Sequence, residues 1–94
     1  MKPRIVGKKI LPKYFNAVRN GTKNFELRKD EDNIQVGEYL LLREWMDGHY
    51  TGQEILVEVI YVLRDCPEYG LMKGYCILGL GGWTWLQYNK EEQT

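Results

Sequence analysis

The strongest strand pattern in the chain runs from Gln53 to Leu63, and it restricts the folds that remain open. Ile55, Val57, Val59 and Tyr61 occupy every second position, so in a strand they share one face. β-branched and aromatic residues of this kind favour extended structure. Because a strand of this length needs partner strands, the chain is predicted to fold around a sheet.

One early segment has helical spacing instead. Apolar residues recur at i, i+3, i+4 and i+7 from Leu11 to Val18, which predicts a helix that begins near Pro12, with Leu11 as its N-cap, and ends at Gly21. Further extended patterns lie at residues 4–9, 23–28, 38–46, 74–80 and 83–88. One early helix followed by four or five mostly antiparallel strands predicts a small α+β protein with a highly curved sheet or a closed barrel.

Glycine pairs and charged residues mark the expected turns. Asp47-Gly48 is a typical hairpin dipeptide, and Gly81-Gly82 is predicted to be a second two-residue hairpin that leads into a last strand. Trp83 and Trp85 would then share one face of that strand. The charged residues 29–33 are expected to form a solvated loop.

Length and composition predict a single soluble domain. The 94 residues are expected to form one domain over positions 1–94, with a polar tail from about residue 89. The beginning of the chain does not resemble a signal peptide and no apolar run is long enough to span a membrane, so a cytoplasmic location is expected. Cys66, Cys76 and His49 lie outside metal-ligand spacing. The cysteines are predicted to be free, buried thiols, and we expect no metal and no cofactor.

The charge balance limits the kind of partner. The 13 Lys and Arg residues equal the 13 Asp and Glu residues, so the formal net charge is zero. Proteins that hold long nucleic-acid duplexes through many phosphates usually carry a basic excess. The balance argues against that class of protein, but it leaves room for a local basic pocket.

The segment after the helix contains the first candidate site. In a strand, Phe25 and Leu27 are expected to point inward, while Glu26 and Arg28 share the other face. Together with Lys23 these charged residues can form a small polar site beside a helix end. Alternatively, Glu26 and Arg28 simply pair on the surface, which contributes at most ~1 kcal/mol.

Short motifs of glycine, aromatic and charged residues extend over most of the chain: Lys9-Ile10-Leu11-Pro12 with Tyr14-Phe15, Gly21, Lys23, Phe25-Glu26 and Arg28, Val36-Gly37, Leu42-Arg43-Glu44-Trp45, Tyr50-Thr51-Gly52, and Gly70-Leu71 with Gly74-Tyr75. The set resembles the ASCH domain of the PUA-like superfamily, in particular a group of small uncharacterised bacterial and phage proteins. The GxKxxExR segment is its most specific part. The resemblance implies a PUA-like β-barrel with one early helix beside a cleft, and binding of RNA or a modified nucleoside.

Some ASCH proteins are small amidohydrolases that remove the acetyl group from N4-acetylcytidine. Their pattern uses a lysine, a threonine nucleophile three residues later and a distant glutamate. The resemblance places Lys23 at the lysine position and Glu26 at the threonine position, and a carboxylate is a poor substitute for an activated hydroxyl as nucleophile. An enzyme of this kind would therefore use Lys23 and Glu26 as catalytic residues, with Glu26 acting as a general base on water.

For the binding hypothesis, Lys23 and Arg28 would hold a phosphate or a carbonyl oxygen, and Glu26 would accept hydrogen bonds from an exocyclic amine or a ribose hydroxyl. Weaker candidates are Arg43, which could meet a phosphate, and Trp45 and Tyr50, on which a base could stack, although Trp45 could equally be a core residue. A third hypothesis is a protein-interaction module, or a homodimer, that uses the face of Trp83 and Trp85.

Overall fold

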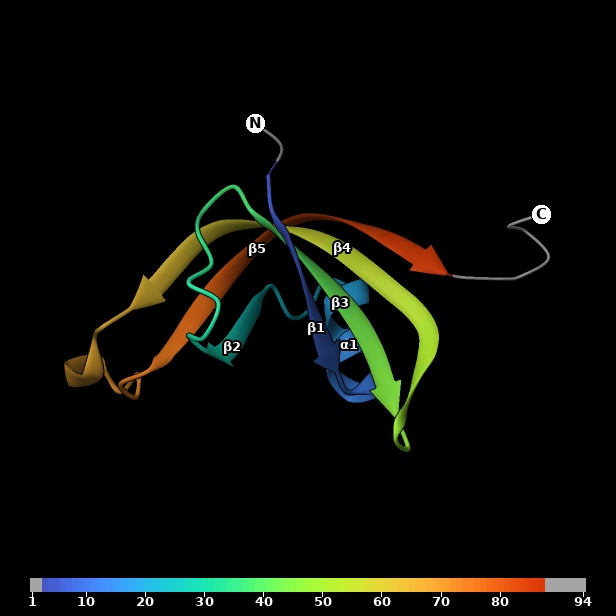
Figure 1. Ribbon diagram of the computed structural model, residues 1–94, viewed down its shortest axis with the longest axis horizontal. Helices are drawn as coiled ribbons and strands as arrows, with labels where there is room; N and C mark the ends of the chain where they lie inside the picture. The colour runs from blue at the N-terminus through green and yellow to red at the C-terminus, as the bar shows by residue number, and fades with distance from the viewer. Residues whose placement is uncertain (1–2, 88–94) are drawn as a thin grey trace.

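The computed structural model describes residues 3–87, and within this range a curled sheet wraps around a short helix (Figure 1). The elements in chain order are β1 (Ile5–Ile10), α1 (Pro12–Arg19), β2 (Phe25–Lys29), β3 (Tyr39–Met46), β4 (His49–Arg64), the 3₁₀ turn η1 (Pro67–Tyr69) and β5 (Tyr75–Gln87). The strand order is β1-β3-β4-β5-β2, with β1 parallel to β3 and the other pairs antiparallel. The predicted small α+β fold with a mostly antiparallel, strongly curved sheet is confirmed. The sheet is a half-barrel, because its edge strands β1 and β2 do not pair.

The last strand corrects the prediction of a hairpin at Gly81-Gly82. β5 continues through both glycines, and its pairing with β4 shifts register between Val57 and Val59. A Cβ on Gly81 would lie 2.7 Å from Cγ2 of Ile60 on the neighbouring strand. The glycines therefore permit a β-bulge at a close approach of two strands, where the sheet bends, and not a chain reversal.

The Asp47-Gly48 turn is confirmed as a hairpin. It joins β3 to β4, and Asp47 and Gly48 have φ angles of 53° and 84°. Two successive residues with positive φ match the type I′ turn, whose twist suits antiparallel strands.

Helix α1 packs inside the curve of the sheet (Figure 1). It begins at Pro12 with Leu11 as N-cap, and Gly21 follows it with a φ of 84°. Phe15 and Val18 are its buried residues. An eight-residue helix has little stability alone, so this packing holds it in place.

The core lies between the helix and the inner face of the sheet. Its fully buried side chains include Leu40, Leu42, Ile55, Val57, Val59 and Leu78. Tyr61 is 62% exposed and does not join its predicted face, because a second register shift, between Val59 and Tyr61, interrupts the alternation. Both cysteines are free and buried, as predicted. Burial raises the pKa of the Cys76 thiol.

The charged residues after β2 are not the plain solvated loop predicted from the sequence. Asp30 accepts two hydrogen bonds from the Arg64 guanidinium, at 2.6 and 3.1 Å. Asp32 pairs with Lys8 of β1. These ion pairs fasten the loop to β1 and to the end of β4. The predicted polar tail from about residue 89 lies outside the described residues.

Candidate binding cleft between the sheet edges

Strand β2 carries its charged residues inward, which is the reverse of the predicted arrangement. Glu26 is only 4% exposed, whereas Phe25 and Leu27 are 45% and 55% exposed. Glu26 and Arg28 do share a face, but that face is the inner one. The expectation that Phe25 and Leu27 point into the core is wrong.

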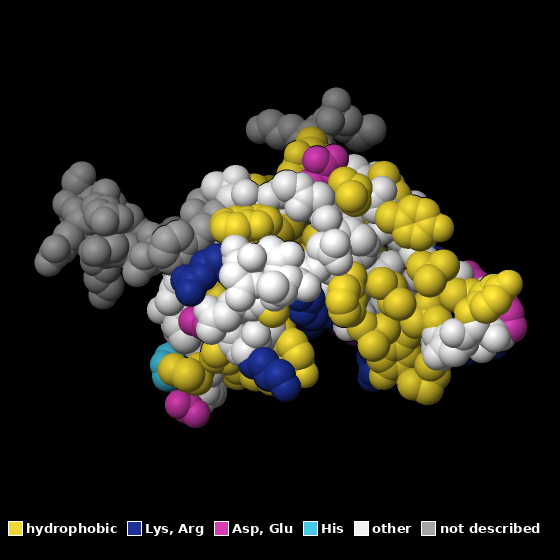
Figure 2. Space-filling model, turned by 180° about the vertical axis from the view of Figure 1, so that it is seen from behind, with side chains coloured by type: hydrophobic (Ala, Val, Ile, Leu, Met, Phe, Trp, Pro, Cys, Tyr) yellow, Lys and Arg dark blue, Asp and Glu magenta, His cyan; other side chains and the backbone are white. Residues whose placement is uncertain are grey.

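The inverted strand is stable because both of its faces find partners. On the outer face, Leu27 lies opposite Ile77 of β5, and Phe25 lies opposite Gly79, where no side chain competes for space. Figure 2 shows apolar side chains gathered over this part of the surface, beside β2 and η1. On the inner face the charged groups satisfy one another, so burial of the carboxylate is tolerated.

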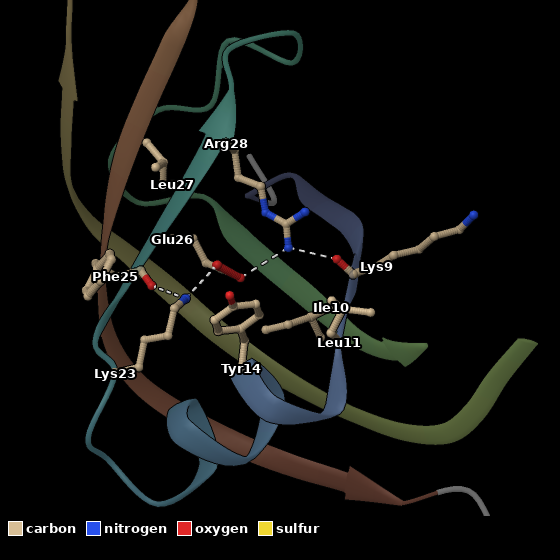
Figure 3. A pocket seen from close by; sticks show the side chains of 9 residues that line it. All are labelled: Lys9, Ile10, Leu11, Tyr14, Lys23, Phe25, Glu26, Leu27 and Arg28. Atoms are coloured by element: carbon tan, nitrogen blue, oxygen red, sulfur yellow. Dashed lines mark hydrogen bonds and ion pairs between the residues drawn. The ribbon is translucent and has the colours of Figure 1, made fainter. Parts of the chain in front are cut away.

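Lys23, Glu26 and Arg28 converge on the inner side of β2, at the edge of the sheet (Figure 3). Nζ of Lys23 lies 2.7 Å from Oε2 of Glu26, and Nη2 of Arg28 lies 3.1 Å from Oε1. Nζ of Lys23 also donates to the carbonyl oxygen of Phe25 at 2.6 Å. The structure thus brings together the three residues that the sequence placed in one site, with the carboxylate held between two cations.

Arg28 also connects the two unpaired edges of the sheet. Its Nη2 donates to the backbone carbonyl oxygen of Lys9, on β1, at 2.8 Å. β1 and β2 are the first and last strands in the sheet order. A guanidinium therefore spans the gap where a closed barrel would have a backbone ladder.

A cleft of about 450 Å³ opens at this gap. Lys23, Glu26 and Arg28 provide its polar groups, and most of the remaining wall is apolar; the other lining residues are Lys9, Ile10, Leu11, Tyr14, Phe25 and Leu27. Concave sites of this size, with apolar walls and a few convergent polar groups, are typical of small-molecule binding.

Tyr14 is a cleft residue that the sequence did not single out as functional. It is 42% exposed, and its hydroxyl points toward Glu26 and Arg28 (Figure 3). Its helical spacing with Phe15 and Val18 predicts that it belongs to the apolar face of the helix. Tyr14 lies at the edge of that face, so its ring lines the cleft.

Arg43, Trp45 and Tyr50 do not line this cleft. Trp45 and Tyr50 pack edge to face with ring centroids 4.8 Å apart, and the Arg43 guanidinium lies 3.8 Å from the centroid of Tyr50. Arg43 also pairs with Glu54 at 2.6 Å. Trp45 is partly buried rather than a core residue. A base that stacked on these rings would have to displace their present partners.

The predicted face of Trp83 and Trp85 can be located only in part. Trp83 is 40% exposed. The side chain of Trp85 lies outside the described residues. A homodimer or protein contact through these two residues stays a prediction.

Residues 3–87 contain neither a metal-binding cluster nor a helix suited to a membrane. No group of three or more His, Cys, Asp and Glu side chains in this part of the chain is arranged to hold a metal ion. Within the same range we find no helix with the length and apolar character that crossing a membrane requires.

Comparison with known proteins places the cleft inside a family. A family described as "Domain of unknown function (DUF3850)" matches residues 7–80, a range that includes every residue lining the cleft. The chain is also similar to the "Uncharacterized 12.9 kDa protein in GpA 3'region" of Escherichia phage P2, with 38% identity over 55 residues. That match covers 58% of this chain and 50% of the phage protein, so the chain spans about half the length of this relative.

Proposed function

The chain belongs to the DUF3850 family, and we propose that its cleft binds the base of a nucleoside, either free or within an RNA strand. One observation carries the proposal: a carboxylate that is 4% exposed lies between a lysine and an arginine at the polar side of a 450 Å³ cleft. The curled sheet with a helix beside a cleft also supports our proposal that the family is related to the ASCH domains of the PUA-like superfamily. The expected cytoplasmic location remains a prediction.

The polar groups of the cleft suit the edge of a base. A carboxylate has about four lone-pair positions, and among the described residues each oxygen of Glu26 accepts a hydrogen bond from one side chain. Glu26 can therefore accept a further hydrogen bond from an exocyclic amine, while Lys23 and Arg28 donate to a carbonyl oxygen. Such a combination of donors and acceptors distinguishes one base from another.

The wall formed by Tyr14 supplies a stacking surface. Its ring is partly exposed within the cleft. Stacking of a base on an aromatic side chain contributes ~1 to 3 kcal/mol. Tyr14 therefore replaces Trp45 and Tyr50 as the first candidate for this contact.

Amide hydrolysis is the alternative function, and the geometry favours it less. A general base must take a proton from water, and each oxygen of Glu26 is already engaged by a cation at 2.7 or 3.1 Å. The arrangement suits an acceptor that orients a ligand better than a base that must exchange protons. Incubation with N4-acetylcytidine tests the alternative: product that forms with wild type and not with Glu26→Gln would establish hydrolysis.

Calorimetric titration of the full chain with cytidine, uridine, adenosine, guanosine and N4-acetylcytidine tests the proposed function. At least one nucleoside should bind, and Tyr14→Leu should weaken it by about 5- to 100-fold, as expected for a lost stacking contact. Tyr69→Leu is the matched control, because Tyr69 is 87% exposed and lies outside the cleft. Absence of binding at millimolar nucleoside and nucleotide, or equal losses in the two variants, would reject base recognition here.

A further inference from the structure

A second hollow, of about 440 Å³, adjoins the cleft. The two share Lys9 and Arg28 as lining residues. Four of the residues around the second hollow are basic and one is acidic, although the whole chain is neutral. The full lining set is Gly7, Lys8, Lys9, Arg28, Lys29, Glu31 and Tyr50.

We propose that this second hollow binds a phosphate group of the same ligand whose base occupies the cleft, so that the ligand is a nucleotide or a nucleic-acid strand and not a nucleoside. The inference rests on the proposed function, because the base in the cleft fixes where the phosphate lies. The composition of the two hollows supports it: the first has mainly apolar walls, and the second mainly cations.

Arg28 has hydrogen-bonding capacity left for such a phosphate. Its contacts to Glu26 and to the Lys9 carbonyl both leave from Nη2. The other terminal nitrogen points away from Glu26 (Figure 3). Nε has no hydrogen-bond partner among the described residues, but it is buried, so the donor open to a ligand is this second terminal nitrogen. A guanidinium can therefore hold the carboxylate on one side and a phosphate oxygen on the other.

Lys29 supplies a further positive charge at this hollow. It is exposed at the end of β2, directly after Arg28, and no ion pair to it occurs within residues 3–87. The side chain of Lys9 lies on the opposite strand edge, with its ammonium 3.9 Å from the ring centroid of Trp45. In Figure 3 the Lys9 side chain points away from Arg28, so a phosphate between β1 and β2 would meet Arg28 and Lys29 first, and Lys9 once its ammonium leaves the Trp45 ring.

Lys8 does not contribute a free charge to this hollow, because it already pairs with two carboxylates. Its ammonium pairs with Asp32 and with Glu31, and only 12% of its side chain is exposed. The hydrogen bond from Lys8 lowers the pKa of the Asp32 carboxyl. Lys8 thus keeps acidic residues of the loop occupied. The charge open to a ligand comes from Arg28 and Lys29, and Lys9 adds to it when its ammonium leaves the Trp45 ring.

The experiment compares ligands with and without phosphate on the full chain. We would titrate the four ribonucleosides, their 3′- and 5′-monophosphates and the dinucleotides UpU and CpC at low salt. At least one phosphorylated ligand should bind ten-fold or more tightly than its nucleoside. A gain with a monophosphate indicates a phosphate monoester, and a gain with the dinucleotide alone indicates the phosphodiester of a strand.

Variants locate the phosphate. Lys29→Gln should bring the ratio of nucleotide to nucleoside affinity down by at least three-fold while leaving nucleoside affinity unchanged. Lys9→Gln changes a residue that lines both hollows, and it should bring the ratio down as well. Lys73→Gln, which removes an exposed lysine outside both hollows, should leave the ratio as in wild type. Equal affinity of nucleotide and nucleoside, or a ratio that neither Lys9→Gln nor Lys29→Gln reduces, overturns this inference and leaves base recognition standing. If the wild type binds neither nucleosides nor nucleotides, both the phosphate site and the proposed base recognition are overturned.

Discussion

Replacing Glu26 by glutamine tests whether the buried carboxylate holds the cleft together. The change keeps the size of the side chain and one acceptor oxygen, but it removes the charge that faces two cations. Glu26 has 6% of its side chain exposed, against 14% for Lys23 and 24% for Arg28. Both cations would then face each other without a carboxylate between them.

The expected loss follows from that burial. Removing one partner of a fully buried ion pair costs about 3 to 5 kcal/mol, and an exposed pair contributes about 0 to 1 kcal/mol. Because the cations around Glu26 are partly solvated, we expect Glu26→Gln to lower the free energy of unfolding by about 2 to 4 kcal/mol. For a domain of this size, that is a fall in Tm of roughly 10 to 20 °C.

The assay is urea and thermal unfolding, followed by circular dichroism, with Glu31→Gln as matched control. Glu31 also pairs with a lysine, but its side chain is 66% exposed, so its replacement should cost less than about 1 kcal/mol. A loss in Glu26→Gln no larger than that of the control would refute the reasoning. A gain in stability would show that the carboxylate is retained for binding at the expense of stability.

Three other changes test the description of the fold. Gly81→Val should cost about 1 to 3 kcal/mol in urea unfolding, because its Cβ would press on Ile60 from 2.7 Å. Leu27→Ser should change the free energy of unfolding by less than about 1 kcal/mol, because Leu27 is 55% exposed. A larger loss would mean that the Leu27 side chain packs in the core. Asp32→Asn should destabilise the protein at neutral pH. In the folded wild type the hydrogen bond from Lys8 lowers the pKa of the Asp32 carboxyl. The difference in stability between wild type and Asp32→Asn should therefore disappear as the pH falls through that pKa, which unfolding measured at a series of acid pH values would show.

The sequence predicted the elements whose signals are local. The Asp47-Gly48 hairpin depends on two backbone conformations that Asp and Gly adopt readily, and the helix depends on spacing and on Pro12. The predicted strand from Gln53 to Leu63 lies within the longer β4. In each case the residues that set the structure are neighbours in the chain, so no partner had to be known.

The inward face of β2 could not be predicted in the same way. Alternation separates Phe25 and Leu27 from Glu26 and Arg28, but it does not say which pair faces the core. Hydrophobicity alone puts the apolar pair inside. The observed choice depends on Lys23 and on the distant Lys9 carbonyl, which together with Arg28 make burial of the carboxylate favourable. A charged side chain can face the interior when oppositely charged and hydrogen-bonding partners are buried beside it.

The prediction of a hairpin at Gly81-Gly82 is wrong for a related reason. Two glycines satisfy a tight turn and a bulge equally well, and only the neighbouring strand distinguishes them. The close approach of Ile60 to Gly81 decides for the bulge. That approach depends on the register of β4 against β5, and the residues around position 81 do not by themselves determine this register.

The open gap between β1 and β2 gives both the cleft and its chemistry. Edge strands expose unpaired backbone groups and usually need protection. A backbone ladder between β1 and β2 would provide it, but it would close the space in which the cleft lies. One hydrogen bond from Arg28 to the Lys9 carbonyl joins the edges and leaves that space open. Because the same guanidinium lines both hollows and holds Glu26, a single side chain joins the edges and also takes part in the binding that we propose.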